Sequence, residues 1–565
     1  MKKLKSPGRI MFTTIMRRES MKKLKSPGRI MFTAALLLIV VLATSVGAER
    51  GYPLKEPAEL KIWYTNPSGA VTKSLGDRLV FQEMERLTGI KIKWTCPSSG
   101  LDNEQFSLML AARDLPDLMG LPSAMGGWFQ VPGGPQKFYR DGVIIKLNDL
   151  IDKYAPNLKY LLKREPELRK QLMSDDGSIY FVPQMRLEPE IRIFSGFMIR
   201  QDWLDKLNLK APVTPDEWYN VLKAFKTRDP NGNGKADEVP FGMSKLATPF
   251  ECTKLPWMFG ANFGQWQNFG LQQVGRKVVF SPITTELKEA LTWMHKLYAE
   301  GLLDPDFPIM ERSQFEAKVL ANVIGSCYGN AGSGITKFMQ GMVGQEPKSF
   351  RMTGIPFPSK ARKKGYNFEP GVIQLATANG LAITTACKNP VAAIKFLDYG
   401  FSKEGHMLFN FGVAGKTYNM ADGYPKFTDL IMANPDGLSA SQAMSKYINE
   451  NWLIAQDVRY FEQYQKIPVK GVEGIPAWDA IQVWTKSLDS SRTLPPITLT
   501  PEESQQTAAK FNEINTYVQE MYFKFILGTV KLEEFNNYVA QVKRMGLDDV
   551  VKVYQAALDR FNARR

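Results

Sequence analysis

The sequence predicts an α/β protein in which helices cover sheets that are largely parallel or mixed. Short apolar strands alternate with amphipathic helices over most of the chain, which is typical of α/β layers. From Thr500 onward the pattern is almost wholly helical. The length of 565 residues exceeds what one hydrophobic core accommodates, so we expect two or three domains.

The alternation starts near residue 60. Residues 60–64 and 90–94 have strand character, and the helix expected at 76–87 places Leu79, Phe81, Met84 and Leu87 on one side. Thr214 as N-cap and Pro215 at the first helical position predict another helix start. Further helices are expected at 103–112, 146–154, 157–172, 284–300, 312–321 and 389–401; further strands at 178–182, 196–199, 323–328 and 380–383; and a loop at 183–192.

No low-complexity linker divides these segments. A chain that crosses between domains more than once, through short hinge segments, fits this pattern better than one flexible tether.

The N-terminus carries a duplicated leader. Residues 1–13 recur letter for letter at 21–33, so we interpret 1–20 as a duplicated or misassigned start and Met21 as the true one. A basic segment, an apolar run at 32–43 and small residues at Val46 and Ala48 then predict a cleaved signal peptide over 21–48. The apolar run is shorter than the ~20 residues that span a bilayer.

The leader also decides where the protein is expected and how its charge is interpreted. No cysteine lies near the cleavage site, so we expect no lipid anchor and a periplasmic location. The leader holds ten Lys or Arg and one Glu, a net +9, so the formal net charge of +15 falls to +6 after cleavage. This excess does not mark a nucleic-acid-binding protein.

Residues 229–238 (DPNGNGKADE) place oxygen donors at alternate positions of a tight loop. Ca²⁺ binds about six to eight oxygens, and the first seven residues match the EF-hand pattern, with glycine at position 6. Position 12 is Pro240 instead of a bidentate Glu, so the last two acids would close the site. The alternative is a plain surface turn. We expect a structural Ca²⁺ held by Asp229, Asn231, Asn233, the Lys235 carbonyl, Asp237 and Glu238.

Catalytic motifs are missing from the sequence. His295 and His406 are the only histidines, and no Ser or Cys nucleophile motif is placed to use either. The glycines at 329–334 are followed by Ile335 where a phosphate loop needs Lys. Glu188 and Glu190 lie too close in sequence for a glycosidase pair. The sequence thus favours a binding protein over an enzyme.

Cysteines and tryptophans complete the candidate groups. Four cysteines form no CxxC pair, which argues against zinc; their pairing stays open, and burial as small apolar side chains is the default. Several tryptophans lie near predicted strand ends and loops, where they could stack on sugar rings, although core packing is the better explanation of any single one. They are Trp63, Trp128, Trp203, Trp257, Trp266, Trp478 and Trp484.

Over residues 57–565 the chain resembles the solute-binding subunits of ABC importers, and is most similar to the larger oligosaccharide-binding type, including alginate-binding periplasmic proteins. The most specific stretches are 197–210 (FMIRQDWLDKLNLK), 222–226 (LKAFK) leading into the cation loop, 410–418 (NFGVAGKTY) and 545–550 (MGLDDV).

This resemblance implies a type II periplasmic-binding fold, with two α/β lobes, a hinge of crossing segments and a ligand cleft between the lobes. The expected N-lobe is 57–190 with 372–435, and the expected C-lobe is 191–371 with 436–565, including the helical C-terminal part. In alginate-binding relatives the matching loop holds Ca²⁺. Lipid-anchored relatives carry a cysteine after the signal peptide, and this chain departs from that pattern.

The resemblance further implies capture of an oligosaccharide, acidic or neutral, by a monomer that closes at its hinge and docks on an ABC permease. A secreted carbohydrate-active enzyme and a binding protein for peptides or other solutes are the alternatives. For an acidic sugar Arg192 would matter most, through bidentate contact with a carboxylate. The expected cleft residues are Trp63, Tyr64, Asn66, Gln184, Arg192, Asp202, Trp257, Trp266, Tyr328, Asn330 and Trp478.

Overall fold

The computed structural model describes residues 52–65, 71–98, 100–122, 125–245, 252–264, 269–361, 363–448, 455–469 and 476–564. Residues 52–565 form one compact unit and residues 1–51 another, so the expected leader lies outside the described residues. Within the described ranges, no helix combines the length and the apolar character that crossing a membrane requires.

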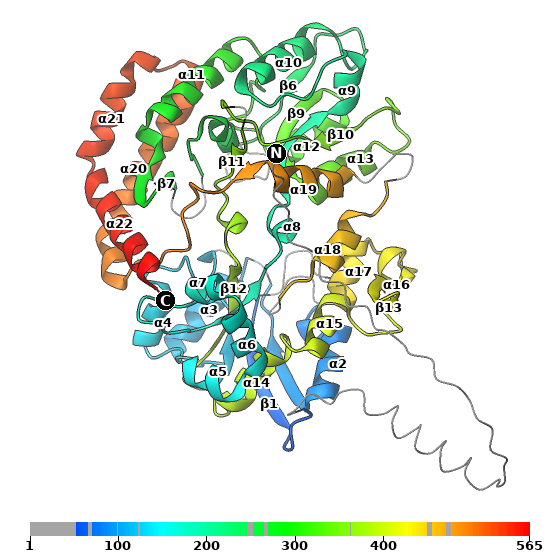
Figure 1. The fold of residues 1–565 in the computed structure, drawn as a ribbon, viewed down its shortest axis with the longest axis vertical. Coiled ribbons are helices and arrows are strands. Elements are labelled where there is room, and N and C mark those ends of the chain that lie inside the picture. Colours follow the sequence, from blue (N-terminus) through cyan, green and yellow to red (C-terminus); the bar gives the residue numbers. More distant parts are fainter. Residues whose placement is uncertain are drawn as a thin grey trace, which may run out of the picture. The chain divides into compact units, whose positions relative to one another are not determined.

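The first sheet has five strands in the order β2-β1-β3-β12-β4. Two of them, β1 and β12, are labelled in Figure 1. β1 runs parallel to β2 and β3, whereas β12 runs antiparallel to β3 and β4, so the sheet is mixed. Its strands are β1 (Ala58–Trp63), β2 (Ile90–Thr95), β3 (Leu118–Met119), β4 (Val182–Met185) and β12 (Ala376–Ile383).

Helices bury their apolar sides against this sheet and form the first core. β1 shows why: Leu60 and Ile62 are fully buried, while Glu59 and Lys61, which alternate with them, are exposed. The helices of this core are α2 (Leu79–Thr88), α3 (Asp102–Ala112), α5 (Asn148–Tyr154), α6 (Pro156–Arg164), α7 (Pro166–Leu172), α14 (Pro390–Tyr399) and α15 (Lys403–Phe411), with α4 (Gly134–Arg140) at its margin.

The second sheet has four strands in the order β10-β5-β9-β6 and is also mixed, because only β6 and β9 run parallel. Its strands are β5 (Ser195–Arg200), β6 (Val239–Phe241), β9 (Ile324–Asn330) and β10 (Met352–Gly354). The helices that bury residues in this second core are α9 (Gln201–Lys206), α10 (Pro215–Thr227), α11 (Thr285–Ala299), α12 (Arg312–Leu320), α13 (Lys337–Gly341), α19 (Pro476–Ser487), α20 (Pro501–Leu527), α21 (Phe535–Arg544) and α22 (Leu547–Ala563).

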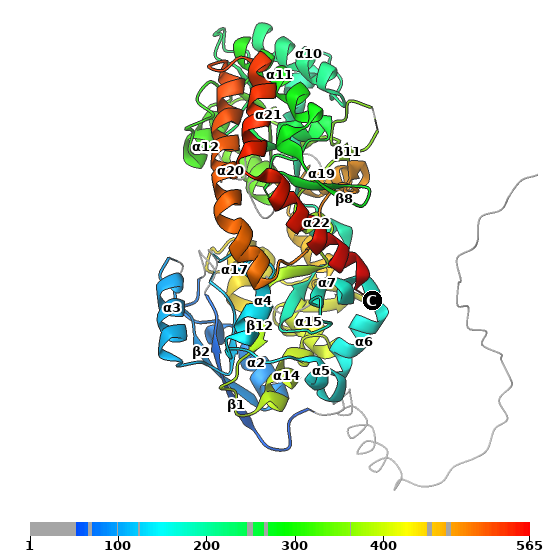
Figure 2. The ribbon, with the colours of Figure 1, turned by 90° about the vertical axis from the view of Figure 1, so that its left-hand side faces the viewer.

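Small strand pairs complete the second core: a hairpin of β7 (Leu271–Val274) and β8 (Lys277–Phe280), and a parallel pair of β11 (Gly365–Tyr366) and β15 (Leu488–Asp489). The long C-terminal helices, coloured orange to red, pack on one another and on α11 (Figure 2).

A third, smaller core follows α15. It contains the hairpin of β13 (Tyr418–Ala421) and β14 (Tyr424–Phe427), together with α16 (Asp429–Met432), α17 (Ala440–Tyr447) and α18 (Val458–Gln465). Its buried residues are Phe411, Tyr418, Ile431, Ala443, Met444, Ile448 and Tyr460.

Each large core draws on two separate stretches of chain. The first core takes residues between Leu60 and Met185 and between Ala376 and Phe409. The second takes residues between Ile193 and Val372 and between Val469 and Phe561. The chain therefore passes between these cores repeatedly, and the exact lobe boundaries predicted above stay a prediction.

The crossing segments are paired to one another around Met185 and Arg186. Met185 faces Ala376 in the pairing of β4 with β12 and forms a parallel bridge with Ala455. The Arg186 amide donates to the Leu375 carbonyl (2.8 Å), and the Gln456 amide donates to the Met185 carbonyl (2.8 Å). Backbone hydrogen bonds thus join the segments near 185, 375 and 456.

Most elements agree with their predictions, but two regions need correction. The helix expected at 157–172 is broken at Glu165 because Pro166 starts a new helix, α7. The strand expected at 178–182 begins only at Val182, and the expected loop 183–192 instead contains the end of β4 and a short helix, α8 (Pro189–Arg192).

All four cysteines carry free thiols. Cys252 and Cys327 are buried as expected, whereas Cys96 and Cys387 are only half-buried.

An ion-pair cluster connects α22 to the turn that follows α7. Both Arg560 and Arg564 bind the Asp175 carboxylate at 2.6 Å, and Arg560 also binds Glu503 in α20 at 2.6 Å. The Arg564 side chain is only 3 % exposed. Met173 and Ile179, on either side of Asp175, belong to the first core, so this cluster ties the C-terminal helix of the second core to the first.

Asp175→Asn removes the shared anion of two arginines that are largely shielded from solvent. We expect the free energy of unfolding to fall by about 2–3 kcal/mol, somewhat less than for a fully buried pair. Urea unfolding measures this. The matched control is Arg140→Gln, because Arg140 also bridges to α20, at Glu502, but both side chains are more than half exposed. Arg140→Gln should lower the free energy of unfolding by at most about 1 kcal/mol. Equal urea midpoints for the two variants would contradict the role given to Asp175.

Candidate functional site

The cation loop lies between α10 and β6 and closes on the Asp229 carboxylate. Its backbone needs left-handed conformations, with φ of 45° at Asp229 and 73° at both Gly232 and Gly234. The amides of Gly232 (2.9 Å), Asn233 (3.2 Å) and Gly234 (3.1 Å) donate to the Asp229 carboxylate. From outside the loop, the Lys206 ammonium donates to the carbonyl oxygens of Asp229 and Pro230.

At the other end of the loop, side-chain amides surround Asp237. Asn231 donates to Asp237 at 2.9 Å and Asn233 at 3.0 Å. Glu238 is 2 % exposed, and its Oε1 has no hydrogen-bond partner. Burial raises the pKa of Glu238, and the charges of Asp229 and Asp237 raise it further. A cation bound to this oxygen would offset the cost of burying it without a partner, so the donor set fits Ca²⁺.

Over the described part of the chain, no three His, Cys, Asp or Glu side chains lie close enough together to hold a metal ion by themselves. The loop contributes three acids, and its other expected donors are two asparagines and a carbonyl.

Several of the expected ligand residues are buried. Trp63, Gln184, Trp257 and Tyr328 are each at most 3 % exposed and belong to the cores or the sheets, so core packing accounts for them. Trp128, Trp203 and Trp484 are packed in the same way. Asp202 acts as the counter-ion of Arg200, which donates to its two carboxylate oxygens at 2.8 and 2.7 Å. Asn66 and Trp266 lie outside the described residues.

The structure brings together some of these residues in the second core. The Trp257 and Tyr328 rings meet edge to face at 5.6 Å, and the Lys254 ammonium lies over both rings. The Tyr328 hydroxyl donates to Glu369 (2.9 Å), which also accepts from Ser195 (2.9 Å). This group is a buried polar cluster at the ends of β5 and β9.

Tyr64, Arg192, Asn330 and Trp478 are half-buried and therefore accessible in part. The Asn330 amide donates to Ser333 (3.3 Å), and the Lys466 ammonium lies 5.5 Å from the centre of the Trp478 ring. Arg192 donates from Nη1 to the Val372 carbonyl (2.6 Å), while its buried Nε has no partner.

Two cavities lie beside the crossing segments. One, of about 680 Å³, is lined by Arg192 together with Lys170, Lys364, Glu167 and Thr485, among others. The other, of about 200 Å³, is lined by Arg186, Ile191, Phe194, Met444, Gln456, Tyr460, Phe461 and Tyr464.

Sequence analysis missed Arg186 and the aromatic residues of α18. Available signals were the spacing of Tyr460, Phe461 and Tyr464 within one helix, and an arginine directly after a strand. They could not be connected from the sequence, because 270 residues separate Arg186 from Gln456, its partner.

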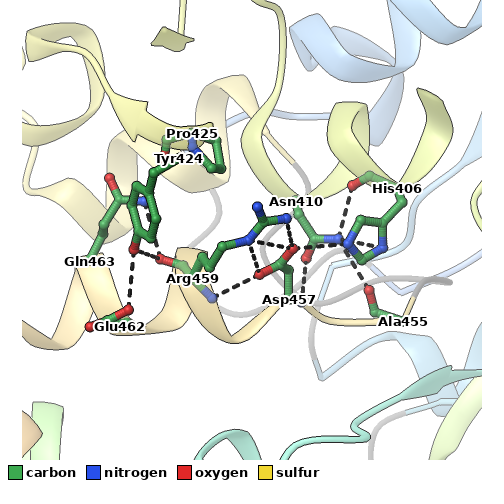
Figure 3. A network of polar contacts seen from close by, with 9 residues as sticks. All are labelled: His406, Asn410, Tyr424, Pro425, Ala455, Asp457, Arg459, Glu462 and Gln463. Carbon is green, nitrogen blue, oxygen red and sulfur yellow. Dashed lines mark hydrogen bonds and ion pairs between the residues drawn. The ribbon is translucent and has the colours of Figure 1, made fainter. Parts of the chain in front are cut away.

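A polar network centred on Asp457 joins α15 to α18 (Figure 3). The Asp457 carboxylate binds His406 Nε2 (3.0 Å) and Arg459 Nε (2.9 Å), and its amide donates to Asn410 (2.9 Å). Burial opposes ionisation of Asp457, but the hydrogen bonds from His406 and Arg459 outweigh it and hold the pKa well below its usual range.

Both histidines thus have structural contacts. His406 contacts Asp457 and Asn410, and His295 Nδ1 lies 3.0 Å from the Ile526 carbonyl.

A protein-family model and several known proteins match this chain. A family model described as bacterial extracellular solute-binding protein matches residues 72–407. The fructooligosaccharide ABC transporter substrate-binding protein FusA of Streptococcus pneumoniae is 26% identical over 536 residues, 91% of this chain and 92% of FusA. The polygalacturonan/rhamnogalacturonan-binding protein YtcQ of Bacillus subtilis is 24% identical over 497 residues, 85% of this chain and 88% of YtcQ.

Solved structures of binding proteins have a similar fold. The alginate-binding protein AlgQ2 without calcium ion superposes with a TM-score of 0.67 at 27% identity, over 90% of this chain and 100% of AlgQ2. FusA in complex with kestose gives 0.68 at 23% identity, and a FusA EF-hand mutant gives 0.66 at 22% identity, each over 90% of this chain and 100% of FusA. The α/β fold is therefore that of the periplasmic binding proteins.

Asp457→Asn tests the network of Figure 3. We expect a loss of about 2–4 kcal/mol in the free energy of unfolding at pH 7, because a buried carboxylate that pairs with the Arg459 guanidinium and also binds His406 is removed. Because the folded-state pKa is depressed, Asp457 stabilises the fold above the unfolded value of about 3.9. This contribution declines as the pH falls below that value.

Urea unfolding of both proteins at several pH values gives the comparison. The difference between them should be constant from pH 7 to 5 and should narrow as the pH falls through 4. A difference that widens toward acid pH would contradict the assigned charge state.

Proposed function

The chain belongs to the bacterial extracellular solute-binding protein family, and we propose that it captures an oligosaccharide in the periplasm and delivers it to the permease of an ABC importer. The observation that carries this proposal is relatedness along nearly the whole chain to binding proteins named for oligo- and polysaccharides, over 91% of its length for FusA. The family consists of binding proteins, and we propose the same role, without catalysis, for a monomer.

The arrangement of the cores supports a closing mechanism. Two mixed sheets have separate cores, and the segments that connect these cores are joined by backbone hydrogen bonds at Met185, Arg186 and Gln456. Bending beside this junction would change the separation of the cores without unfolding either. A ligand that contacts both cores favours the closed state by the difference in its affinity for the two states.

Ligand capture is testable through intrinsic tryptophan fluorescence. Trp478 is half-buried beside the Lys466 ammonium, so closure around a sugar should change its environment. We expect at least one oligosaccharide from a panel of neutral and uronic-acid glycans to shift the emission and to release heat in calorimetry. Trp478→Phe should reduce the fluorescence change, whereas Trp293→Phe is the control, since Trp293 packs against Phe259 beside the second core.

Two outcomes would contradict the proposal. One is the absence of both signals across the whole panel, with binding of peptides instead. The other is cleavage of an oligosaccharide, detected by mass spectrometry after long incubation.

We also propose that the loop 229–238 holds a structural Ca²⁺. Support comes from its alternating oxygen donors, from the unpartnered Oε1 of buried Glu238, and from two similar structures, described as AlgQ2 without calcium ion and as a FusA EF-hand mutant. The ion would be held by Asp229, Asn231, Asn233, the Lys235 carbonyl, Asp237 and Glu238. To accept it, the asparagine side chains would turn their oxygens, instead of their amide groups, toward the ion.

Asp229→Ala combined with Asp237→Ala tests this proposal. The parent should melt at a higher temperature in Ca²⁺ than in EGTA, because an ion at 100 times its dissociation constant adds about 2.7 kcal/mol of stability. The double variant should have a lower melting temperature than the parent in Ca²⁺, and this temperature should be the same in EGTA. Glu513→Ala, an exposed acid of α20, is the control and should keep the Ca²⁺ response. If the parent protein has the same melting temperature in Ca²⁺ and in EGTA, the loop is only a turn.

A further inference from the structure

Arg186 has no carboxylate partner among the residues that the structure describes. It follows β4 directly, lines the 200 Å³ cavity, and makes no ion pair among the described residues. Burial lowers the pKa of its guanidinium, and among the described groups Tyr460 raises it. A desolvated charge that lacks a partner is costly, so a structure that keeps one usually supplies the counter-charge from elsewhere.

The guanidinium is oriented for a ligand. Its Nε donates to Gln456 Oε1 (2.8 Å), and its Cζ lies 6.0 Å from the centre of the Phe194 ring. Gln456 is itself buried and donates from Nε2 to the Tyr460 hydroxyl (3.0 Å). With Nε held in this way, Nη1 and Nη2 remain as a pair of parallel donors, the arrangement that binds a carboxylate through both oxygens.

The rest of the cavity wall suits a sugar ring. Tyr460, Phe461 and Tyr464 of α18 and Phe194 supply aromatic surface, and Gln456 supplies a polar group. Its volume is below the roughly 300–1,000 Å³ of pockets that enclose a whole drug-sized ligand. The cavity therefore matches one sugar unit at the end or middle of a longer chain.

Acidic groups near this cavity are engaged elsewhere or point to other partners. Asp457 binds His406 and Arg459, and Glu462 binds Lys466 and the Tyr424 hydroxyl. Burial raises the pKa of Glu188, the charges of Asp457 and Glu190 raise it further, and no ion pair joins Glu188 to Arg186 among the described residues. No described carboxylate thus neutralises Arg186.

We propose that the oligosaccharide bound by this protein carries a carboxylate, as in a uronic acid, and that Arg186 binds this carboxylate through Nη1 and Nη2 beside Gln456, Tyr460 and Tyr464. This inference rests on the proposed function and adds the chemical class of the ligand and the residue that selects it.

Arg192, the arginine singled out by sequence analysis, is a weaker candidate for the same role. Its Nη1 is bound to the Val372 carbonyl, and Glu188 and Glu190 both lie near enough to stabilise its charge. The 680 Å³ cavity beside it also contains an acid, Glu167, together with Lys170 and Lys364. The cations of the 680 Å³ cavity therefore have nearby carboxylates that offset their charge, whereas Arg186 has none among the described residues.

The test compares one glycan with and without its charge. Calorimetry measures the affinity of the purified protein for oligogalacturonides and alginate oligosaccharides of two to four units, for their methyl esters, and for neutral kestose. The variants are Arg186→Gln and Arg186→Lys, with Arg192→Gln for comparison and Arg86→Gln, an exposed arginine of α2, as the surface control.

We expect one acidic glycan to bind the parent protein about 10- to 100-fold more tightly than its methyl ester, the range for a hydrogen bond to a charged group. Arg186→Gln should lower affinity for the acid to that for the ester and leave affinity for the ester unchanged. Arg186→Lys keeps a charge without the paired donors and should give an intermediate affinity. It also serves as the test if Arg186→Gln does not fold.

Three outcomes would overturn the inference while leaving the proposed function intact. They are equal affinity for acid and ester, tight binding of kestose with none of an acidic glycan, and loss of acid preference in Arg192→Gln but not in either Arg186 variant. Failure of every glycan to bind the parent protein would instead overturn the proposed function.

Discussion

Backbone pairing at Met185 and Arg186 is the constraint on which the rest of this structure depends. Met185 faces Ala376 on one side and Ala455 on the other, and the Arg186 amide donates to Leu375. Segments from three distant parts of the sequence are thereby held in one place. Because these bonds use peptide groups, most side-chain substitutions cannot remove them, and any movement between the cores must occur beside the junction. One such place is the irregular pairing of β12 with β4 between Ala376 and Gly380.

The junction also determines where a bound ligand can influence the movement between the cores. Arg186 contributes its backbone to the pairing and its side chain to the adjacent cavity, so a ligand that contacts this guanidinium acts next to the crossing segments. Gln456 has the same double role, with its amide bound to the Met185 carbonyl and its side chain bound to Arg186. Occupancy of the cavity and the geometry of the crossings therefore share the same residues.

The fold was largely predictable because its elements have strong local signals. Thr214 and Pro215 predicted the start of α10, and the Thr214 side chain does accept from the Glu217 amide. The errors at 157–172 and 178–192 arose where Pro166 restarts a helix after a single residue and where burial, not alternation, makes 182–185 a strand. The loop 229–238 could be recognised because all its donors are local in sequence.

The ligand site could not be predicted in the same way. Conspicuous tryptophans such as Trp63 and Trp257 pack in the cores, and only long-range contacts reveal that Arg186, Gln456 and Tyr460 meet. The pairing of residues 270 positions apart is a property of the tertiary fold, which no local pattern records.

The composition of each core from two separate stretches has an evolutionary consequence. A single recombination event between related genes joins one N-terminal part to one C-terminal part, and here it would divide at least one core between two parents. Exchange of the intact second core would require breakpoints near 185, near 375 and before 469, because its residues come from 193–372 and from 469–561. Changes in ligand preference are therefore more accessible through point substitutions at the crossing segments than through the exchange of whole lobes.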